Sequence, residues 1–210
     1  MVDITKKTFD YELDFKKAVS ELTQIDPRFS KIIGLVGFPR PRTVDTGFPA
    51  LFRIIVGQQL STAAANSIWY KLLEGGVTES SALLRSNDEF LRSLGLSRTK
   101  IQYAKGLADS NLDYSKLENQ TNDDVINKLV TIKGIGKWTA EIYLMFGLQR
   151  IDIFAHGDLA LQEAVKALLD LEFRPSPKQM AVISIKWKPL RTIAALILWK
   201  YYGYLKLNKG

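Results

Sequence analysis

The spacing of apolar residues over 48–74 is the feature that most restricts the fold of this 210-residue chain. Apolar side chains lie there near the spacing of an amphipathic helix. The residues that carry this spacing are Leu51, Ile54, Ile55, Ala63, Ile68 and Leu72. Gly75 and Gly76 follow directly and form a stop signal. The segment therefore predicts helical structure that ends at Gly75.

Helical patterns continue along most of the remaining chain. We predict further helices over 79–85, 87–93, 98–109, 122–130, 137–147, 158–169, 176–184 and 189–203. The alternation typical of a strand is confined to Val182–Trp187, and that stretch is short. The loop Gly37-Phe-Pro-Arg-Pro-Arg42 is expected to be irregular. The predicted fold class is all-α, with many short helices.

A tight turn between two predicted helices is the sharpest local motif. In Leu129-Val-Thr-Ile-Lys-Gly-Ile-Gly-Lys-Trp-Thr-Ala140 one helix ends and the next begins at once. The glycines of Lys133-Gly134-Ile135-Gly136-Lys137 permit positive φ and leave backbone N–H groups uncovered. Unpaired N–H groups at a helix start favour a phosphate, and both lysines would add positive charge. The motif favours a helix-hairpin-helix that grips a DNA backbone. An ordinary helical turn is the alternative.

Residue usage excludes several kinds of site. The chain has no cysteine, so it has no disulfide, no thiol nucleophile and no thiolate-held iron–sulfur cluster. A single histidine, His156, argues against a zinc site of the Cys/His kind. No apolar run approaches the roughly 20 residues of a membrane-spanning helix, and the N-terminus lacks the apolar core of a secretion signal. We therefore expect an intracellular protein with no cofactor, no required metal and no membrane partner.

Positive charge is concentrated toward the C-terminus. The net charge is +7, and the last forty residues carry eight Lys and Arg against Glu172 alone. Such a basic region suits a polyphosphate partner such as DNA. A solvated surface is the alternative interpretation.

Two aspartates and the single histidine lie just beyond the second helix of the hairpin. Asp158 immediately precedes an apolar-periodic helix, so its position alone indicates an N-cap. Asp152 is interpreted as loop surface or a turn former. His156 is interpreted as structural or solvent-exposed. Position alone therefore singles out no catalytic group.

From Phe48 to Trp199 the chain resembles the helix-hairpin-helix DNA glycosylase superfamily, specifically its 3-methyladenine-DNA glycosylase II branch. Four blocks in order carry the resemblance. They are Ile55-Val-Gly-Gln-Gln-Leu-Ser61, Ile132-Lys-Gly-Ile-Gly-Lys-Trp-Thr-Ala140, Asp152-Ile-Phe-Ala-His-Gly-Asp-Leu159 and Trp187-Lys-Pro-Leu-Arg-Thr-Ile-Ala-Ala-Leu-Ile-Leu-Trp199.

The resemblance implies a monofunctional enzyme of base excision repair. Such an enzyme flips an N3- or N7-alkylated purine, for example 3-methyladenine, out of duplex DNA and hydrolyses its N-glycosidic bond. The first alternative is a glycosylase of the same fold that acts on deaminated or oxidised bases. The second is a non-catalytic helix-hairpin-helix module that only binds DNA.

The resemblance also assigns the central residues of the site. The essential aspartate of the family falls on Asp158, which can be an N-cap and catalytic at once. Relatives that also nick DNA use a lysine immediately before the hairpin's Thr-Ala. This chain has Trp138 there and Lys137 one residue earlier, so no lyase activity is expected. Trp138 and Trp199 match base-pocket positions, and burial in the core is their alternative role.

Two further groups of residues follow from the resemblance. Gln58 and Gln59 fall where the family inserts a side chain into the gap left by the flipped base. The residue matching Gln59 is often apolar in this branch, so the neighbouring Leu60 is also a candidate. Two glutamines on a solvated helix face are the third interpretation. Hairpin carbonyls that often hold a sodium or potassium ion would be those of Val130, Ile132 and Ile135.

At the level of the whole chain we expect a single catalytic domain over 1–210, made of two lobes with a DNA-facing cleft between them. One lobe spans roughly 48–150 and contains the helix-hairpin-helix at 122–147. The other combines 1–47 with 158–210. About 47 residues precede Phe48, too few for the extra N-terminal β-rich domain of some members. We expect a monomer located with the cell's DNA.

The chemistry fits these residue types. Alkylation at purine N3 or N7 leaves a positive charge on the base, so the leaving group needs little protonation. An ionised carboxylate can then stabilise the developing sugar cation and orient a water. Flipping costs about a few kcal/mol. A cationic base over an indole face regains roughly 0.5–2 kcal/mol.

Overall fold

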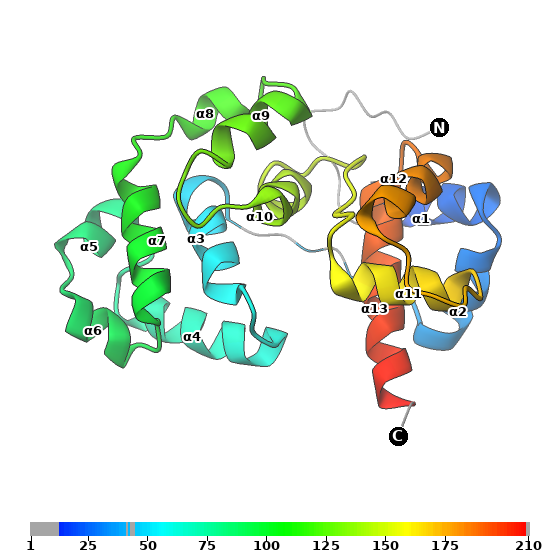
Figure 1. The fold of residues 1–210 in the computed structure, drawn as a ribbon, viewed down its shortest axis with the longest axis horizontal. Helices are drawn as coiled ribbons and strands as arrows, with labels where there is room; N and C mark the ends of the chain where they lie inside the picture. Colours follow the sequence, from blue (N-terminus) through cyan, green and yellow to red (C-terminus); the bar gives the residue numbers. More distant parts are fainter. Residues whose placement is uncertain (1–12, 41, 43–44, 209–210) are drawn as a thin grey trace. The chain divides into compact units, whose positions relative to one another are not determined.

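The computed structural model describes residues 13–40, 42 and 45–208, which divide into two compact units (Figure 1). Unit 1 combines residues 1–42 with residues 149–210, and unit 2 spans residues 43–148. Residues 1–12, 41, 43–44 and 209–210 lie outside the described part. The beginning of the predicted lobe 1–47 and part of the predicted loop 37–42 therefore lie outside it as well.

The described residues of both units form helices and loops without a strand, so the predicted all-α class is confirmed. The helices of unit 1 are α1 (Leu13–Ile25), α2 (Arg28–Val36), α11 (Leu159–Leu168), α12 (Pro177–Ile183), the 3-10 helix η2 (Ser184–Trp187) and α13 (Arg191–Leu207). The stretch Val182–Trp187, which alternates like a strand in the sequence, is helical.

Unit 2 holds the remaining helices. They are α3 (Gly47–Gly57), α4 (Thr62–Glu74), α5 (Ser80–Arg85), α6 (Asp88–Ser93), α7 (Arg98–Asp109), α8 (Tyr114–Leu117), α9 (Asn122–Leu129), α10 (Lys137–Ile142) and the π-helical turn η1 (Tyr143–Gly147).

In unit 1 the long helix α13 packs against α11 and α2 (Figure 1). Its segment 192–198 is buried throughout, as the apolar run Ile-Ala-Ala-Leu-Ile-Leu requires. Beside it lies the fully buried Trp187, whose ring centroid is 5.4 Å from that of Phe29 and 5.5 Å from that of Phe154. The Trp187 indole N–H donates to the buried Asp26 carboxylate over 2.9 Å. A buried indole usually finds such a partner, so Trp187 belongs to the core.

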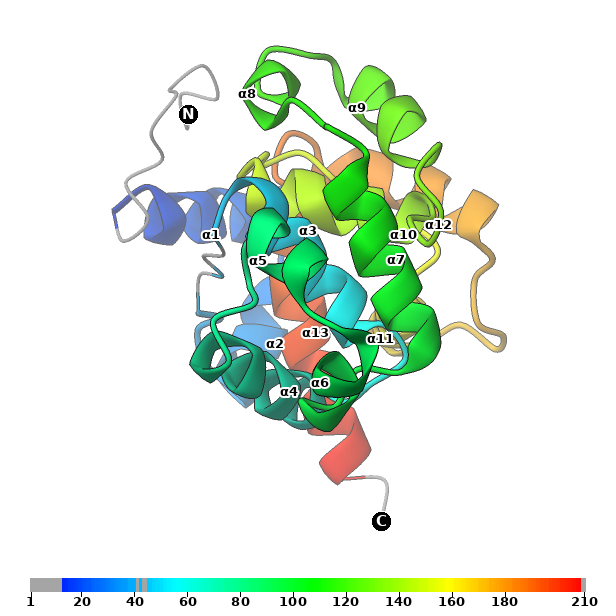
Figure 2. The same ribbon diagram turned by 90° about the vertical axis from the view of Figure 1, so that its left-hand side faces the viewer.

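In unit 2 helix α3 is central and packs against α4, α7 and η1 (Figure 2). Leu51, Phe52 and Ile55 are fully buried on α3, and the ring of Phe52 meets that of Trp69 edge-on at 5.6 Å. These contacts hold α3 in place. Its C-terminal end leads into Gln58, Gln59 and Leu60, the candidates for the wedge, which is the side chain that fills the gap left by a flipped base.

The structure corrects the predicted helix boundaries in one important place. The segment 48–74 was predicted as continuous helical structure, yet the chain leaves the helix between Gly57 and Thr62. Gln59 has a left-handed backbone with φ of 58°, and Ser61 caps α4 by accepting the Ala64 N–H. The result is two helices joined by an exposed loop. Helices α1, α2 and α8 were also not among the predicted elements.

Candidate active site

Asp158 is the N-cap of α11 in unit 1. Its backbone is extended, with φ of −73° and ψ of 120°, and its Oδ1 accepts the Leu161 N–H over 2.9 Å. The side chain is half-buried. A carboxylate at this position faces the positive end of the helix dipole. The geometry therefore gives Asp158 the cap that its position indicates, while leaving a charged group at the helix start.

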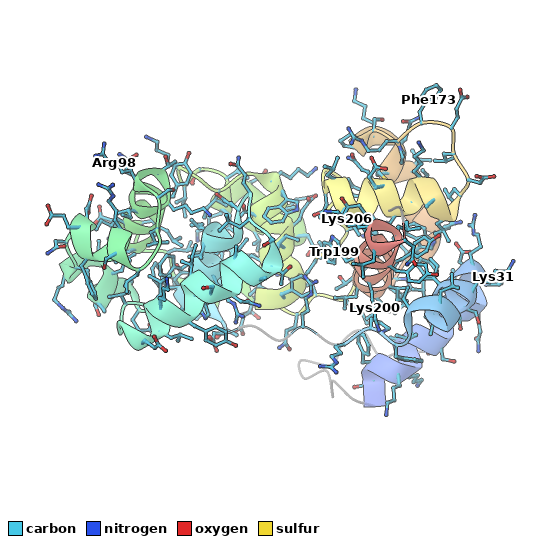
Figure 3. The ribbon with its side chains drawn as sticks, turned by 90° about the horizontal axis from the view of Figure 1, so that it is seen from below. Lys31, Arg98, Phe173, Trp199, Lys200 and Lys206 are labelled. Carbon is cyan, nitrogen blue, oxygen red and sulfur yellow. The ribbon has the colours of Figure 1, made fainter. Side chains whose placement is uncertain are left out.

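Trp199 lies against this carboxylate. It projects from α13, where Figure 3 labels it beside Lys200, and α13 packs along α11. Its indole Nε1 donates to Asp158 Oδ1 over 3.1 Å. Trp199 is half-buried, in contrast to the fully buried Trp187 on the preceding η2. The carboxylate of Asp158 and the N–H edge of the Trp199 indole thus meet at a partly exposed position.

Arg42 completes this cluster. Its Cζ lies 5.2 Å from the centroid of the Trp199 ring, which is cation–π distance. Although Arg42 as a residue is exposed, desolvation of its guanidinium lowers the pKa from its ordinary value, and the charge of Asp158 opposes that shift. No pattern in the sequence singles out Arg42, because its contacts join the loop after α2 to α13.

The other ionisable groups near Asp158 in the sequence are held elsewhere in unit 1. Asp152 forms a two-point ion pair with Arg191, with Oδ1 at 2.6 Å from Nε and Oδ2 at 2.9 Å from Nη2. His156 Nε2 lies 3.1 Å from Ser184 Oγ. Both side chains therefore serve contacts that order the segment leading to Asp158.

The predicted hairpin lies in unit 2. Helix α9 ends at Leu129, the Ile132 N–H donates to the Leu129 carbonyl and the Ile135 N–H to the Ile132 carbonyl, each over 3.0 Å. Gly134 has φ of 91°, and Gly136 is the N-cap of α10. The turn is therefore as tight as its two glycines predict.

The hairpin places its two lysines and its isoleucine differently. Lys133 is exposed, and so is the side chain of Lys137 at 70%, with its Nζ 4.0 Å from Glu141 Oε1. Ile135 is buried and anchors the turn. Trp138, on the first turn of α10, is half-buried.

The three predicted wedge residues, in the loop between α3 and α4, differ in their contacts. Gln58 Nε2 donates to the Gly134 carbonyl over 2.9 Å and to Thr139 Oγ1 over 3.1 Å, so its amide ties this loop to the hairpin. Gln59 and Leu60 are exposed. Sequence reasoning missed the bracing role of Gln58, because its partners lie more than seventy residues further on.

The described residues hold no group of three or more His, Cys, Asp or Glu side chains that could bind a metal ion. A monovalent ion would rely on the carbonyls of Val130, Ile132 and Ile135. Of these, the Ile132 carbonyl already accepts the Ile135 N–H, and a carbonyl oxygen retains a second lone pair. Among the helices of the described chain, none is long and apolar enough to cross a membrane.

The fold and the site together define the class of the protein. It is an all-α protein with a glycine hairpin between two helices and a later aspartate at a helix N-cap. The model of the HhH-GPD superfamily of base excision DNA repair proteins matches residues 52–189, a span that contains the hairpin and Asp158. The chain belongs to this superfamily.

Several known proteins are similar over most of their length. DNA-3-methyladenine glycosylase 1 of Schizosaccharomyces pombe is 32% identical over 196 residues, covering 88% of this chain and 86% of the relative. The structure of the S. pombe 3-methyladenine DNA glycosylase in complex with abasic DNA is 30% identical with a TM-score of 0.79, covering 88% of this chain and 95% of that one. A DNA-3-methyladenine glycosidase from Bacillus halodurans is 34% identical with a TM-score of 0.71, covering 91% of both chains.

A more distant likeness concerns the fold alone. The 8-oxoguanine glycosylase/lyase of Clostridium acetobutylicum, in complex with DNA, is 15% identical with a TM-score of 0.75, covering 98% of this chain and 75% of that one. The same fold therefore also carries lyase chemistry, so the fold does not decide between hydrolase and lyase.

Proposed function

We propose that this chain is a monofunctional DNA glycosylase that releases N3- or N7-alkylated purines from duplex DNA. The observation that carries the proposal is the half-buried Asp158 carboxylate, held at the N-cap of α11 and by the Trp199 indole N–H. The similar glycosylases of S. pombe and B. halodurans, which are named for 3-methyladenine, support the substrate class.

In the proposed reaction the bond between purine N9 and sugar C1′ breaks, and its electron pair leaves with the base. Alkylation has already placed a positive charge on that base, so the departing purine becomes neutral without a protein acid. The sugar acquires oxocarbenium character, which the Asp158 carboxylate stabilises. A water then bonds to C1′ and gives its proton to the carboxylate or to solvent. The products are free base and an abasic site.

Trp199 and Trp138 are the proposed pocket aromatics, and the hairpin 133–137 is the proposed phosphate contact. Trp199 also positions the Asp158 carboxylate through its indole N–H. It would therefore both bind the flipped base and orient the catalytic group. The hairpin offers helix-start N–H groups and exposed lysines, the combination that binds backbone phosphate without reading sequence. Gln59 and Leu60 are the proposed wedge, while Gln58 holds the hairpin against their loop.

The absence of lyase activity is part of the proposal. Trp138 occupies the position at which nicking relatives carry their Schiff-base lysine, and Lys137 lies one residue earlier with its ammonium 4.0 Å from Glu141. Borohydride should therefore trap no covalent complex with DNA. We further propose that the enzyme acts as a monomer where the cell keeps its DNA.

Release of free base from methylated duplex DNA by purified protein, resolved by chromatography, tests the proposal. We expect 3-methyladenine in the soluble fraction and an intact strand bearing an abasic site. Release of only neutral lesions, such as hypoxanthine, would contradict the substrate class. Binding to DNA with no base released would instead indicate a non-catalytic DNA-binding module.

A further inference from the structure

Arg42 occupies the aromatic face beside the candidate catalytic carboxylate. Its guanidinium carbon lies 5.2 Å from the Trp199 ring centroid, and the same indole donates to Asp158. The charge of Asp158 acts on Arg42 as well. A planar, delocalised cation therefore lies over the indole and within the field of the carboxylate, all inside unit 1.

The loop that carries Arg42 is fastened to the same part of α13. Lys200, the residue after Trp199, donates from Nζ to the Phe38 carbonyl over 2.7 Å. Gly37 ends α2 as its C-cap, with φ of 73°. Two consecutive residues of α13 thus contact two points of one short loop, so the placement of Arg42 does not depend on a single contact.

We propose that Arg42 is a further residue of the base-binding site, which occupies the face of Trp199 in the free protein and leaves it when a flipped base enters. The proposal rests on the proposed function, because it takes the Trp199 face as the base pocket. An alkylated purine resembles the guanidinium in the property that matters here: both are flat and carry a delocalised positive charge.

Displacement of Arg42 has one quantitative consequence. The Arg42–Trp199 contact is lost once per flipping event, whichever base takes its place. The free energy needed to break this contact therefore lowers the rate of release of every base by the same factor. It does not favour one methylated purine over another. Removing the guanidinium should accelerate release of all of them equally.

The test is single-turnover release from methylated duplex DNA at saturating enzyme, comparing wild type with Arg42→Ala. For a partly exposed cation–π contact we expect the variant to be about two- to fivefold faster, and by the same factor for 3-methyladenine and 7-methylguanine. Arg40→Ala is the matched control, because Arg40 is an exposed arginine of the same loop and its loss changes net charge equally. It should leave the rates at the wild-type value.

Arg42→Lys keeps the charge without the flat guanidinium and should give rates between wild type and Arg42→Ala. If the alanine variant does not fold, the comparison of Arg42→Lys with wild type still tests the proposal. Rates for Arg42 variants equal to or below those of Arg40→Ala would overturn the proposal. So would acceleration confined to one methylated base, since this indicates a base-specific contact. If wild type releases no methylated base, the proposed function itself fails, and the displacement of Arg42 by a base falls with it.

Discussion

At position 134, backbone conformation and packing both require glycine. The φ of 91° at Gly134 lies in the left-handed region that favours glycine. A Cβ at this position would lie 2.2 Å from Cγ of Tyr103, on α7. The backbone of the hairpin turn thus packs closely against the Tyr103 ring of α7, while its two lysines are exposed.

Gly134→Ala should lower the free energy of unfolding by about 2 kcal/mol or more, because the left-handed backbone and the ring contact are both strained. Gly106→Ala is the matched control, since that glycine lies in α7 and a methyl group added there would have nothing within 4 Å. The control should raise stability by about 0.5–1 kcal/mol. Urea unfolding measures both, and equal effects of the two substitutions would contradict this account of the turn.

Leu60 is the exposed apolar residue of the loop that follows Gln58, and 40% of it is accessible. If Leu60 fills the space left by a flipped base, Leu60→Ala should slow base release from duplex DNA about tenfold. This factor corresponds to the approximate free energy of burying a leucine side chain. Leu73→Ala on α4, where 46% of the residue is accessible, should leave the rate unchanged. Gln59→Ala belongs in the same series. A full effect there and none at Leu60 would assign the wedge to the amide.

At the scale of elements, the hairpin was predictable because its signals are local. Two glycines, the end of one apolar period and the start of another all fall within 129–140, and the structure has the turn there. The break between α3 and α4 was missed for a physical reason. Apolar residues near helical spacing lie on both sides of the break, while the interruption itself depends on one left-handed glutamine and one serine cap.

The candidate site was predictable only in part. Asp158 follows from its place before an apolar helix and from the family resemblance, and its N-cap bond agrees with the first of these. Its contact with Trp199, the place of Arg42 over that ring and the bracing by Gln58 join segments far apart in the chain. Periodicity and spacing carry no information about such contacts. The roles assigned to these residues therefore stay predictions.

At the scale of the whole molecule, the hairpin is in unit 2 and Asp158 is in unit 1, so the proposed phosphate contact and the proposed catalytic carboxylate belong to different compact units. The net charge of +7 favours association with a polyanion in general. The exposed Lys133 and Lys137 flank the helix start and are the cations we assign to backbone phosphate.

Lys133→Gln and Lys137→Gln should each weaken duplex binding uniformly across sequences. Each should also reduce the slope of log affinity against log salt by about 1, since one fewer phosphate is neutralised. Lys31→Gln on α2, labelled in Figure 3, removes an equal charge from an exposed position outside the hairpin. Titrations at several salt concentrations distinguish the two cases. The same small change in all three variants would make the hairpin lysines ordinary surface charge.

The central claim is that the charge of Asp158 drives base release. Asp158→Asn tests it most directly, because asparagine is an equally good N-cap and can still accept from Leu161 and Trp199. Asp170→Asn, an exposed aspartate after α11, is the control. We predict that Asp158→Asn lowers the single-turnover release of 3-methyladenine by about 100-fold or more while duplex affinity and stability stay near wild type. Near-normal release by this variant would contradict the mechanism.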